Sequence, residues 1–126
     1  MNFVKKNAVA DYRNNYTVFL TDWINAIIES NKIIIVEGKK DKKALLELGV
    51  DDSQIVCLNS ALYKIIDEII FLKKEVIILT DFDTEGKKLY SVLKKGLEKE
   101  GVIVDNVFRE ALRRYTKVSH IEGMKN

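Results

Sequence analysis

Two aspartates, one residue apart, follow a short apolar run in the middle of the chain. The run covers residues 76–79, and Asp81 and Asp83 come directly after it, with Gly86 three residues further on. A short, continuous apolar run bounded by turn residues is typical of a strand that is buried on both faces. Open α/β sheets bind ligands beyond the carboxyl ends of such strands. We therefore expect a functional site at the two aspartates.

A third carboxylate, Glu37, ends another apolar run, residues 32–36, and Gly38 follows it. Two carboxylates about 4 Å apart repel by roughly 4 kcal/mol at an effective dielectric constant of about 20. A divalent cation offsets that repulsion, and Mg²⁺ is usually held by one or two carboxylates plus substrate phosphates. Taken singly, Asp81 or Asp83 could equally be a helix cap or a turn residue. Together with Glu37 they predict a site for Mg²⁺, with Mn²⁺ as the alternative ion.

Patterns of strand and helix alternate four times along the chain. This alternation predicts an α/β fold with a four-stranded parallel sheet, right-handed crossovers and helices on both faces. The carboxyl ends of parallel strands lie along one edge, which brings the three acids together. The expected strands are 32–38, 54–58, 76–79 and 102–108, and the expected helices are 16–30, 39–48, 61–72, 84–100 and 109–115.

Composition limits the classes of protein that fit. A chain of 126 residues that is 47% hydrophobic and has no proline indicates one compact domain. A net charge of only +2 means that nucleic-acid binding would have to depend on local clusters of basic residues. Cys57, the single cysteine, is expected to be a small buried hydrophobic residue. The absence of a signal-peptide pattern and of a long apolar stretch favours a cytoplasmic protein with no membrane segment.

Within this single domain we expect three parts. Residues 1–31 form an N-terminal helical segment that packs on the core, residues 32–108 form the core, and residues 109–126 form a basic helix and a tail. The tail has no clear pattern, and His120, the only histidine, is given no catalytic role. The sequence leaves the oligomeric state open.

The two acidic motifs together resemble the toprim domain. Residues 36–41 read Val-Glu-Gly-Lys-Lys-Asp, and residues 81–86 read Asp-Phe-Asp-Thr-Glu-Gly. The toprim domain is shared by bacterial-type primases, type IA and type II topoisomerases, the nuclease that matures 5S ribosomal RNA, and overcoming-lysogenization-defect nucleases. The resemblance covers about residues 32–108 and implies a Rossmann-like toprim fold. The chain is most similar to small stand-alone toprim proteins of archaea and bacteria.

The resemblance implies a role for each acid. Glu37 matches the glutamate that acts as general acid or base or helps to bind metal, and Asp81 and Asp83 match the aspartates that coordinate Mg²⁺. Asp41 matches the acid of the first motif, whose role we expect to be structural. Gly38 and Gly86 support the motifs because glycine permits a close backbone approach or an unusual turn. The separate domain that carries the nucleophilic tyrosine of topoisomerases has no counterpart here, so Tyr90 and Tyr115 are not expected to act as nucleophiles.

Basic residues near the motifs suggest the class of substrate. The candidates for binding phosphate or nucleic acid are Lys39, Lys87, Arg109 and Arg113, because Lys39 lies within the first motif, Lys87 follows the second, and the two arginines follow the expected fourth strand. Lys42, Lys43 and Lys88 fit a solvated helix face instead. The resulting hypothesis is Mg²⁺-dependent phosphodiester chemistry on nucleic acid, nuclease-like cleavage of structured RNA or DNA.

Two alternatives stay open. The first is a metal-dependent nucleic-acid-binding subunit without turnover, which a protein partner would complete. The second is a phosphatase similar to the haloacid-dehalogenase family, whose motif Asp-x-Asp-x-Thr/Val is matched only in part, because Glu85 stands at its fifth position.

Overall fold

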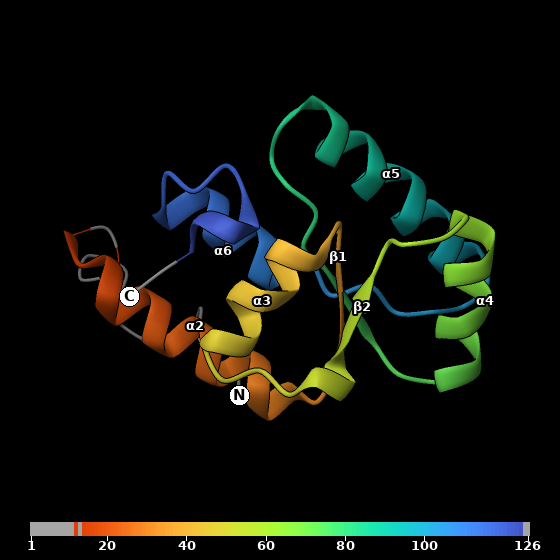
Figure 1. Cartoon of the computed structure of the whole chain (residues 1–126), viewed down its shortest axis with the longest axis horizontal. Coiled ribbons are helices and arrows are strands. Elements are labelled where there is room, and N and C mark those ends of the chain that lie inside the picture. The colour runs from red at the N-terminus through yellow and green to blue at the C-terminus, as the bar shows by residue number, and fades with distance from the viewer. Residues whose placement is uncertain (1–11, 13, 125–126) are drawn as a thin grey trace.

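A parallel sheet of three strands forms the centre of the molecule (Figure 1). The structure is a computed structural model that describes residue 12 and residues 14–124. The strands are β1 (Ile33–Val36), β2 (Ile55–Cys57) and β3 (Val76–Ile78), and they lie in the order β2-β1-β3. Residues of β1 and β3 are buried throughout, as expected for strands covered on both faces.

Helices cover both faces of the sheet, which confirms the predicted α/β arrangement. Figure 1 shows α2, α3 and α6 on one side of the sheet and α4 and α5 on the other. Successive residues of a strand point to opposite faces, so Ile34 and Val36 join the first cluster of buried side chains while Ile33 and Ile35 join the second. The helices are α2 (Tyr16–Ser30), α3 (Lys39–Glu47), α4 (Leu62–Leu72), α5 (Thr84–Lys99) and α6 (Val107–Tyr115), with 3₁₀ turns η2 (Asp52–Gln54) and η3 (Ile121–Gly123).

The predicted fourth strand, residues 102–108, is wrong. Val104 forms only an isolated parallel bridge with Val76, so the described part of the chain has three strands rather than four. The Asp105 side chain then accepts a hydrogen bond from the N–H of Val107, at 3.0 Å, and α6 begins at that residue. Asp105 therefore turns the chain out of the sheet soon after the bridge.

The apolar residues at the end of the expected strand belong to a helix instead. Phe108, Ala111, Leu112 and Tyr115 are buried, at the spacing of three and four residues that places them on one helix face. Phe108 was assigned to a strand because a short apolar run fits either structure. The helical spacing can be recognised only when Phe108 is considered together with the buried residues that follow it.

Helix α2 is joined to α6 by the largest side chain of the core. Trp23 is fully buried, and its indole N–H donates to the carbonyl of Phe108 at 2.9 Å. Asn31 ends α2 in the left-handed conformation, with φ of 54°, as predicted for its stop. Residues 1–11 and 13 of the predicted N-terminal segment lie outside the described residues.

The C-terminal tail, residues 116–124, folds back onto the core rather than trailing away. Ile121 and Met124 are buried in the cluster that contains α2 and α6, and Val118 packs against it. The turn η3 also packs against α3. No helix among the described residues combines the length and the apolar character needed to cross a membrane.

An ionic contact fixes the chain where it leaves the sheet. The ammonium group of Lys32 lies 2.7 Å from a carboxylate oxygen of Asp105 and 3.1 Å from one of Glu75. Burial alone would lower the pKa of Lys32, but the hydrogen bonds with these two acids outweigh burial and raise it. The contact therefore stabilises the folded state while Lys32 is charged.

We expect Lys32→Met to lower the free energy of unfolding by about 1 kcal/mol at neutral pH. The pKa of Lys32 is raised in the folded state, so the contribution is fully present below the unfolded value of 10.5 and is lost as the pH rises through the folded value. Urea denaturation of both proteins across this pH range measures the difference. Lys94→Met, which removes an exposed pair with Glu98 on α5, is the control and should change stability much less. A difference that stays constant as the pH rises would contradict this account.

Candidate metal centre

The candidate site is built on residues 80–86, which we call the Asp81 loop. This segment leads from β3 into α5 and includes the first residues of that helix. The loop is closed by Thr80, whose buried hydroxyl donates to the carbonyl of Gly86 at 2.7 Å. Gly86 lies directly against the backbone of Asp81, because a Cβ atom built on it would stand 2.0 Å from the Asp81 carbonyl oxygen. The loop can therefore close only with glycine at this position.

Each aspartate of the loop uses one carboxylate oxygen to accept a backbone N–H. Oδ1 of Asp83 accepts from the N–H of Gly86 at 2.8 Å, which makes Asp83 the N-cap of α5. Oδ1 of Asp81 accepts from the N–H of Ile121 in the tail, also at 2.8 Å. These bonds orient both carboxylates and leave the second oxygen of each available to a cation.

Glu37 lies beside the loop, at the end of β1. Its Oε2 accepts a hydrogen bond of 2.7 Å from the backbone N–H of Asp81. Burial raises the pKa of Glu37; the bond from Asp81 opposes this, while the charges of Asp81, Asp83 and Asp41 raise it further. The adjacent strands β1 and β3 thus bring the three predicted acids to one edge of the sheet.

Arg109 is buried and supports the backbone of the Asp81 loop. Its side chain is buried, and its guanidinium N–H groups donate to the carbonyl oxygens of Thr80 and, at 3.1 Å, Asp81. The guanidinium carbon lies 4.5 Å from the ring centroid of Phe82 and 4.5 Å from that of Tyr90. Burial lowers the pKa of Arg109, but nearby acids, including Glu37 and Asp81, favour its charge.

This position differs from the predicted role of Arg109 in binding phosphate. With both terminal nitrogens bonded to backbone carbonyls, we assign the side chain to holding the loop. Phe82, the residue between the two aspartates, turns away from them and packs on the guanidinium.

The tail adds a side chain that the sequence did not single out. Nε2 of His120 lies 3.4 Å from Oδ2 of Asp83, and Asp81, Asp83 and His120 each offer one ligand atom, all within 4.8 Å of one another. Glu37 is not a member of this close set. The apolar residues Val118, Ile121 and Met124, spaced by three, are the one feature of the tail's sequence that could have indicated its packing on the core.

Two carboxylates and one imidazole form a donor set that fits a divalent cation. Without a cation, hydrogen bonds and the nearby guanidinium offset part of the repulsion between Asp81 and Asp83, and His120 lies beside Asp83. Asp81, Asp83 and His120 could together hold a cation at this position, and Glu37 lies next to them.

The other predicted residues fall into two groups. Asp41 is buried, and its carboxylate accepts the N–H of Gly38 at 3.1 Å, so it stabilises the start of α3, in line with the structural role expected of it. Lys39 and Lys87 are exposed in the first turns of α3 and α5, the helices that begin at this edge. Arg113 is exposed on α6 and paired with Glu110 at 2.8 Å. Only the two lysines therefore stand beside the acids.

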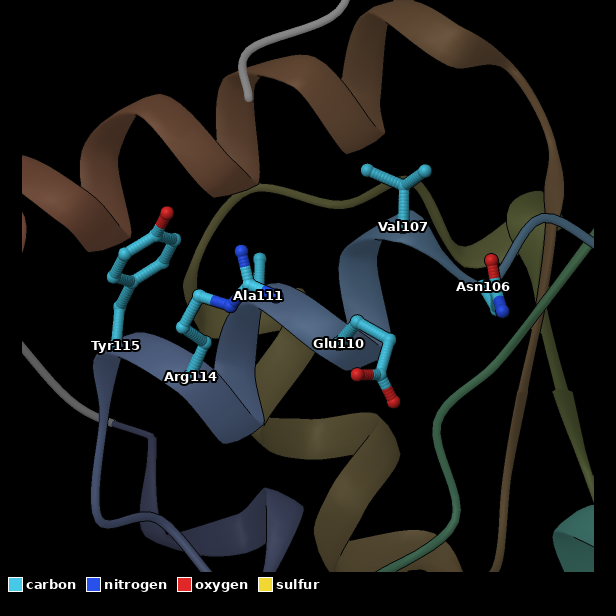
Figure 2. Close-up of a pocket in the computed structure, with 6 residues that line it drawn as sticks. All are labelled: Asn106, Val107, Glu110, Ala111, Arg114 and Tyr115. Atoms are coloured by element: carbon cyan, nitrogen blue, oxygen red, sulfur yellow. The ribbon is translucent and has the colours of Figure 1, made fainter. Parts of the chain in front are cut away.

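Two of the surface hollows formed by the described residues lie along the tail and along α6. The larger, of about 390 Å³, is lined by Tyr16, Lys117, Val118, Ser119, His120 and Gly123, so it reaches the histidine of the site. The smaller, of about 190 Å³, lies along α6 and is lined by none of the three acids of the candidate site (Figure 2). Its lining residues are Asn106, Val107, Glu110, Ala111, Arg114 and Tyr115. The first hollow is therefore the one of the two that reaches the candidate site.

Comparison with known proteins places this site in context. The family model described as the toprim domain matches residues 31–108. A UPF0292 protein of Pyrococcus abyssi is 35% identical over 117 residues, which is 91% of this chain and 87% of that protein. A UPF0292 protein of Methanocaldococcus jannaschii is 38% identical over 86 residues, 68% of this chain and 67% of that protein.

A solved structure is also similar. The protein, described as a putative protein from Aquifex aeolicus, aligns with a TM-score of 0.77 at 30% sequence identity. The alignment covers 83% of this chain and 97% of that structure.

The close approach of Gly86 to Asp81 gives a direct test of the loop. Gly86→Ala should lower the free energy of unfolding by about 3 kcal/mol, because the added methyl would overlap the Asp81 carbonyl. Gly123→Ala is the matched control, since no atom lies within 4 Å of a Cβ at that position. Chemical denaturation of both variants gives the two values. Equal, small losses would show that the loop does not need glycine.

Proposed function

This chain belongs to the toprim domain family, and we propose that it carries out Mg²⁺-dependent phosphodiester cleavage of structured RNA or DNA. Toprim domains bind divalent metals and act in nucleic-acid chemistry, which is the coarse function that the family match supports. The observation that carries the finer proposal is the hydrogen bond of 2.7 Å from the backbone N–H of Asp81 to Oε2 of Glu37, at the edge of the sheet where Asp83 also lies. The same match favours this chemistry over the phosphatase alternative.

In this proposal Asp81 and Asp83 hold the cation and Glu37 moves the proton. A divalent cation supplies charge stabilisation for the phosphodiester when it is bound. As water attacks the phosphorus, the bond to the leaving oxygen breaks; the water loses a proton and the leaving oxygen gains one. Glu37 is suited to one of these transfers, because its raised pKa brings it closer to neutral pH than an ordinary glutamate.

The surroundings of the acids support an anionic substrate. Helices α3 and α5 both begin at this edge, and the N-terminus of a helix favours phosphate. Lys39 and Lys87 extend from these first turns into solvent. The hollow beside His120 is also lined by Lys117, so the tail adds a further positive charge to those of Lys39 and Lys87 for binding a strand of nucleic acid.

The metal role predicts a loss of affinity when the aspartates are neutralised. Calorimetric titration of the wild-type protein with Mg²⁺ should show one site, and Asp81→Asn/Asp83→Asn should remove it, because the amides keep the shape but lose the charge. Asp67→Asn, which changes an exposed aspartate of α4, should bind as the wild type does. Unchanged binding in the double variant would disprove the ligand assignment.

The proton-transfer role predicts a loss of turnover without a loss of metal. Glu37→Gln can still accept the N–H of Asp81, so the loop should stay intact while cleavage falls by a factor of about 10² to 10⁴. The assay uses Mg²⁺ with a panel of hairpin RNAs and branched or nicked DNAs, and samples with a chelator give the background.

Binding of the same panel, measured in parallel, separates cleavage from the alternative of a binding subunit. If both proteins bind nucleic acid and neither cleaves it, the chain is a metal-dependent binding subunit that needs a partner. Equal cleavage by both proteins would remove Glu37 from the mechanism.

A further inference from the structure

We propose that His120 is a metal ligand of the site and that its imidazole shifts the preferred ion from Mg²⁺ toward Mn²⁺. This inference rests on the proposed function, because it concerns the same cation. It assigns a coordinating role to a residue outside both acidic motifs and outside the segment 31–108 that the family model matches.

The backbone fixes the position of His120. The N–H of Phe82 donates to the carbonyl of Ser119 at 2.8 Å, and the N–H of Ile121 donates to Oδ1 of Asp81 at 2.8 Å. The residues on both sides of His120 are thus hydrogen-bonded to the Asp81 loop. Ile121 is also fully buried, so the tail cannot leave the loop without exposing apolar surface.

The ring is oriented as it is in many metal sites. Nδ1 lies 3.0 Å from the hydroxyl oxygen of Ser119, and Nε2 faces the carboxylate of Asp83. Histidines that bind metals usually hold their second ring nitrogen in a hydrogen bond of this kind, because it sets the tautomer and the ring plane. When Nδ1–H donates to Ser119, the lone pair is on Nε2, the nitrogen that lies 3.4 Å from Oδ2 of Asp83.

A simple ion pair with Asp83 explains less of this arrangement. The pair would require only one carboxylate, whereas ligand atoms of both Asp81 and Asp83 lie within 4.8 Å of the imidazole and of each other. The side chain of His120 is also half exposed, so the site is open to water and to substrate oxygens.

The predicted preference for Mn²⁺ over Mg²⁺ depends on the imidazole nitrogen. Mg²⁺ prefers oxygen ligands throughout, while the affinity of sites that contain nitrogen rises from Mn²⁺ along the first transition row. Loss of the imidazole should therefore weaken Mn²⁺ binding by about tenfold or more and change Mg²⁺ binding little.

Pulsed electron paramagnetic resonance of the Mn²⁺-loaded protein tests the proposal directly. His120 is the only histidine, so modulation from an imidazole nitrogen in tag-free wild-type protein can come from no other side chain. We expect this modulation in the wild type and in Lys117→Ala, and we expect it to vanish in His120→Gln. Calorimetric titration of the same three proteins with Mn²⁺ and with Mg²⁺ gives the ratio of affinities.

The outcomes separate this inference from the function on which it rests. Mn²⁺ binding without nitrogen modulation overturns the role of His120 and leaves the carboxylate site standing. An equal loss of Mn²⁺ and Mg²⁺ affinity in His120→Gln also overturns it, because the residue would then only hold the tail. A wild-type protein that binds neither ion would overturn both the inference and the proposed function.

Discussion

The guanidinium of Arg109 is buried beneath a loop whose two carboxylates repel each other. It donates to the carbonyls of Thr80 and Asp81 and packs on the rings of Phe82 and Tyr90, so it places a positive charge near the carboxylates and also supports the backbone of the loop. Backbone N–H groups from α5 and from the tail complete the support by bonding to Asp83 and Asp81. The fold thus keeps two acids close and oriented, which is the arrangement that a divalent cation requires.

Part of this support comes from residues outside the matched toprim segment. Arg109 and the tail both follow residue 108, where the family match ends. The acids follow β1 and β3 of the core. The elements after residue 108 support the backbone of the Asp81 loop through Arg109 and add His120 to the site. The C-terminal part is therefore a structural component of the site, and its packing on α2 and α3 links the site to the whole core.

The sequence was informative where residues suited to a functional site follow a clear strand pattern. The acids that end β1 and β3 could be recognised because parallel strands place their carboxyl ends at one edge. The fourth strand was mistaken because Val107 and Phe108 follow the apolar residues 102–104 after only two polar residues, whereas their helical spacing becomes visible only together with Ala111 and Leu112. Arg109 and His120 could not be placed, because their roles depend on contacts with residues 28 and 37 positions away along the chain.

The central claim is that the Asp81 loop and the tail together form a divalent metal site. Anomalous X-ray diffraction from crystals grown with Mn²⁺ tests it most directly, because the ion itself is located. The account predicts one strong peak within bonding distance of carboxylate oxygens of Asp81 and Asp83 and of Nε2 of His120. Peaks found only elsewhere on the surface, or no peak at millimolar Mn²⁺, would contradict it.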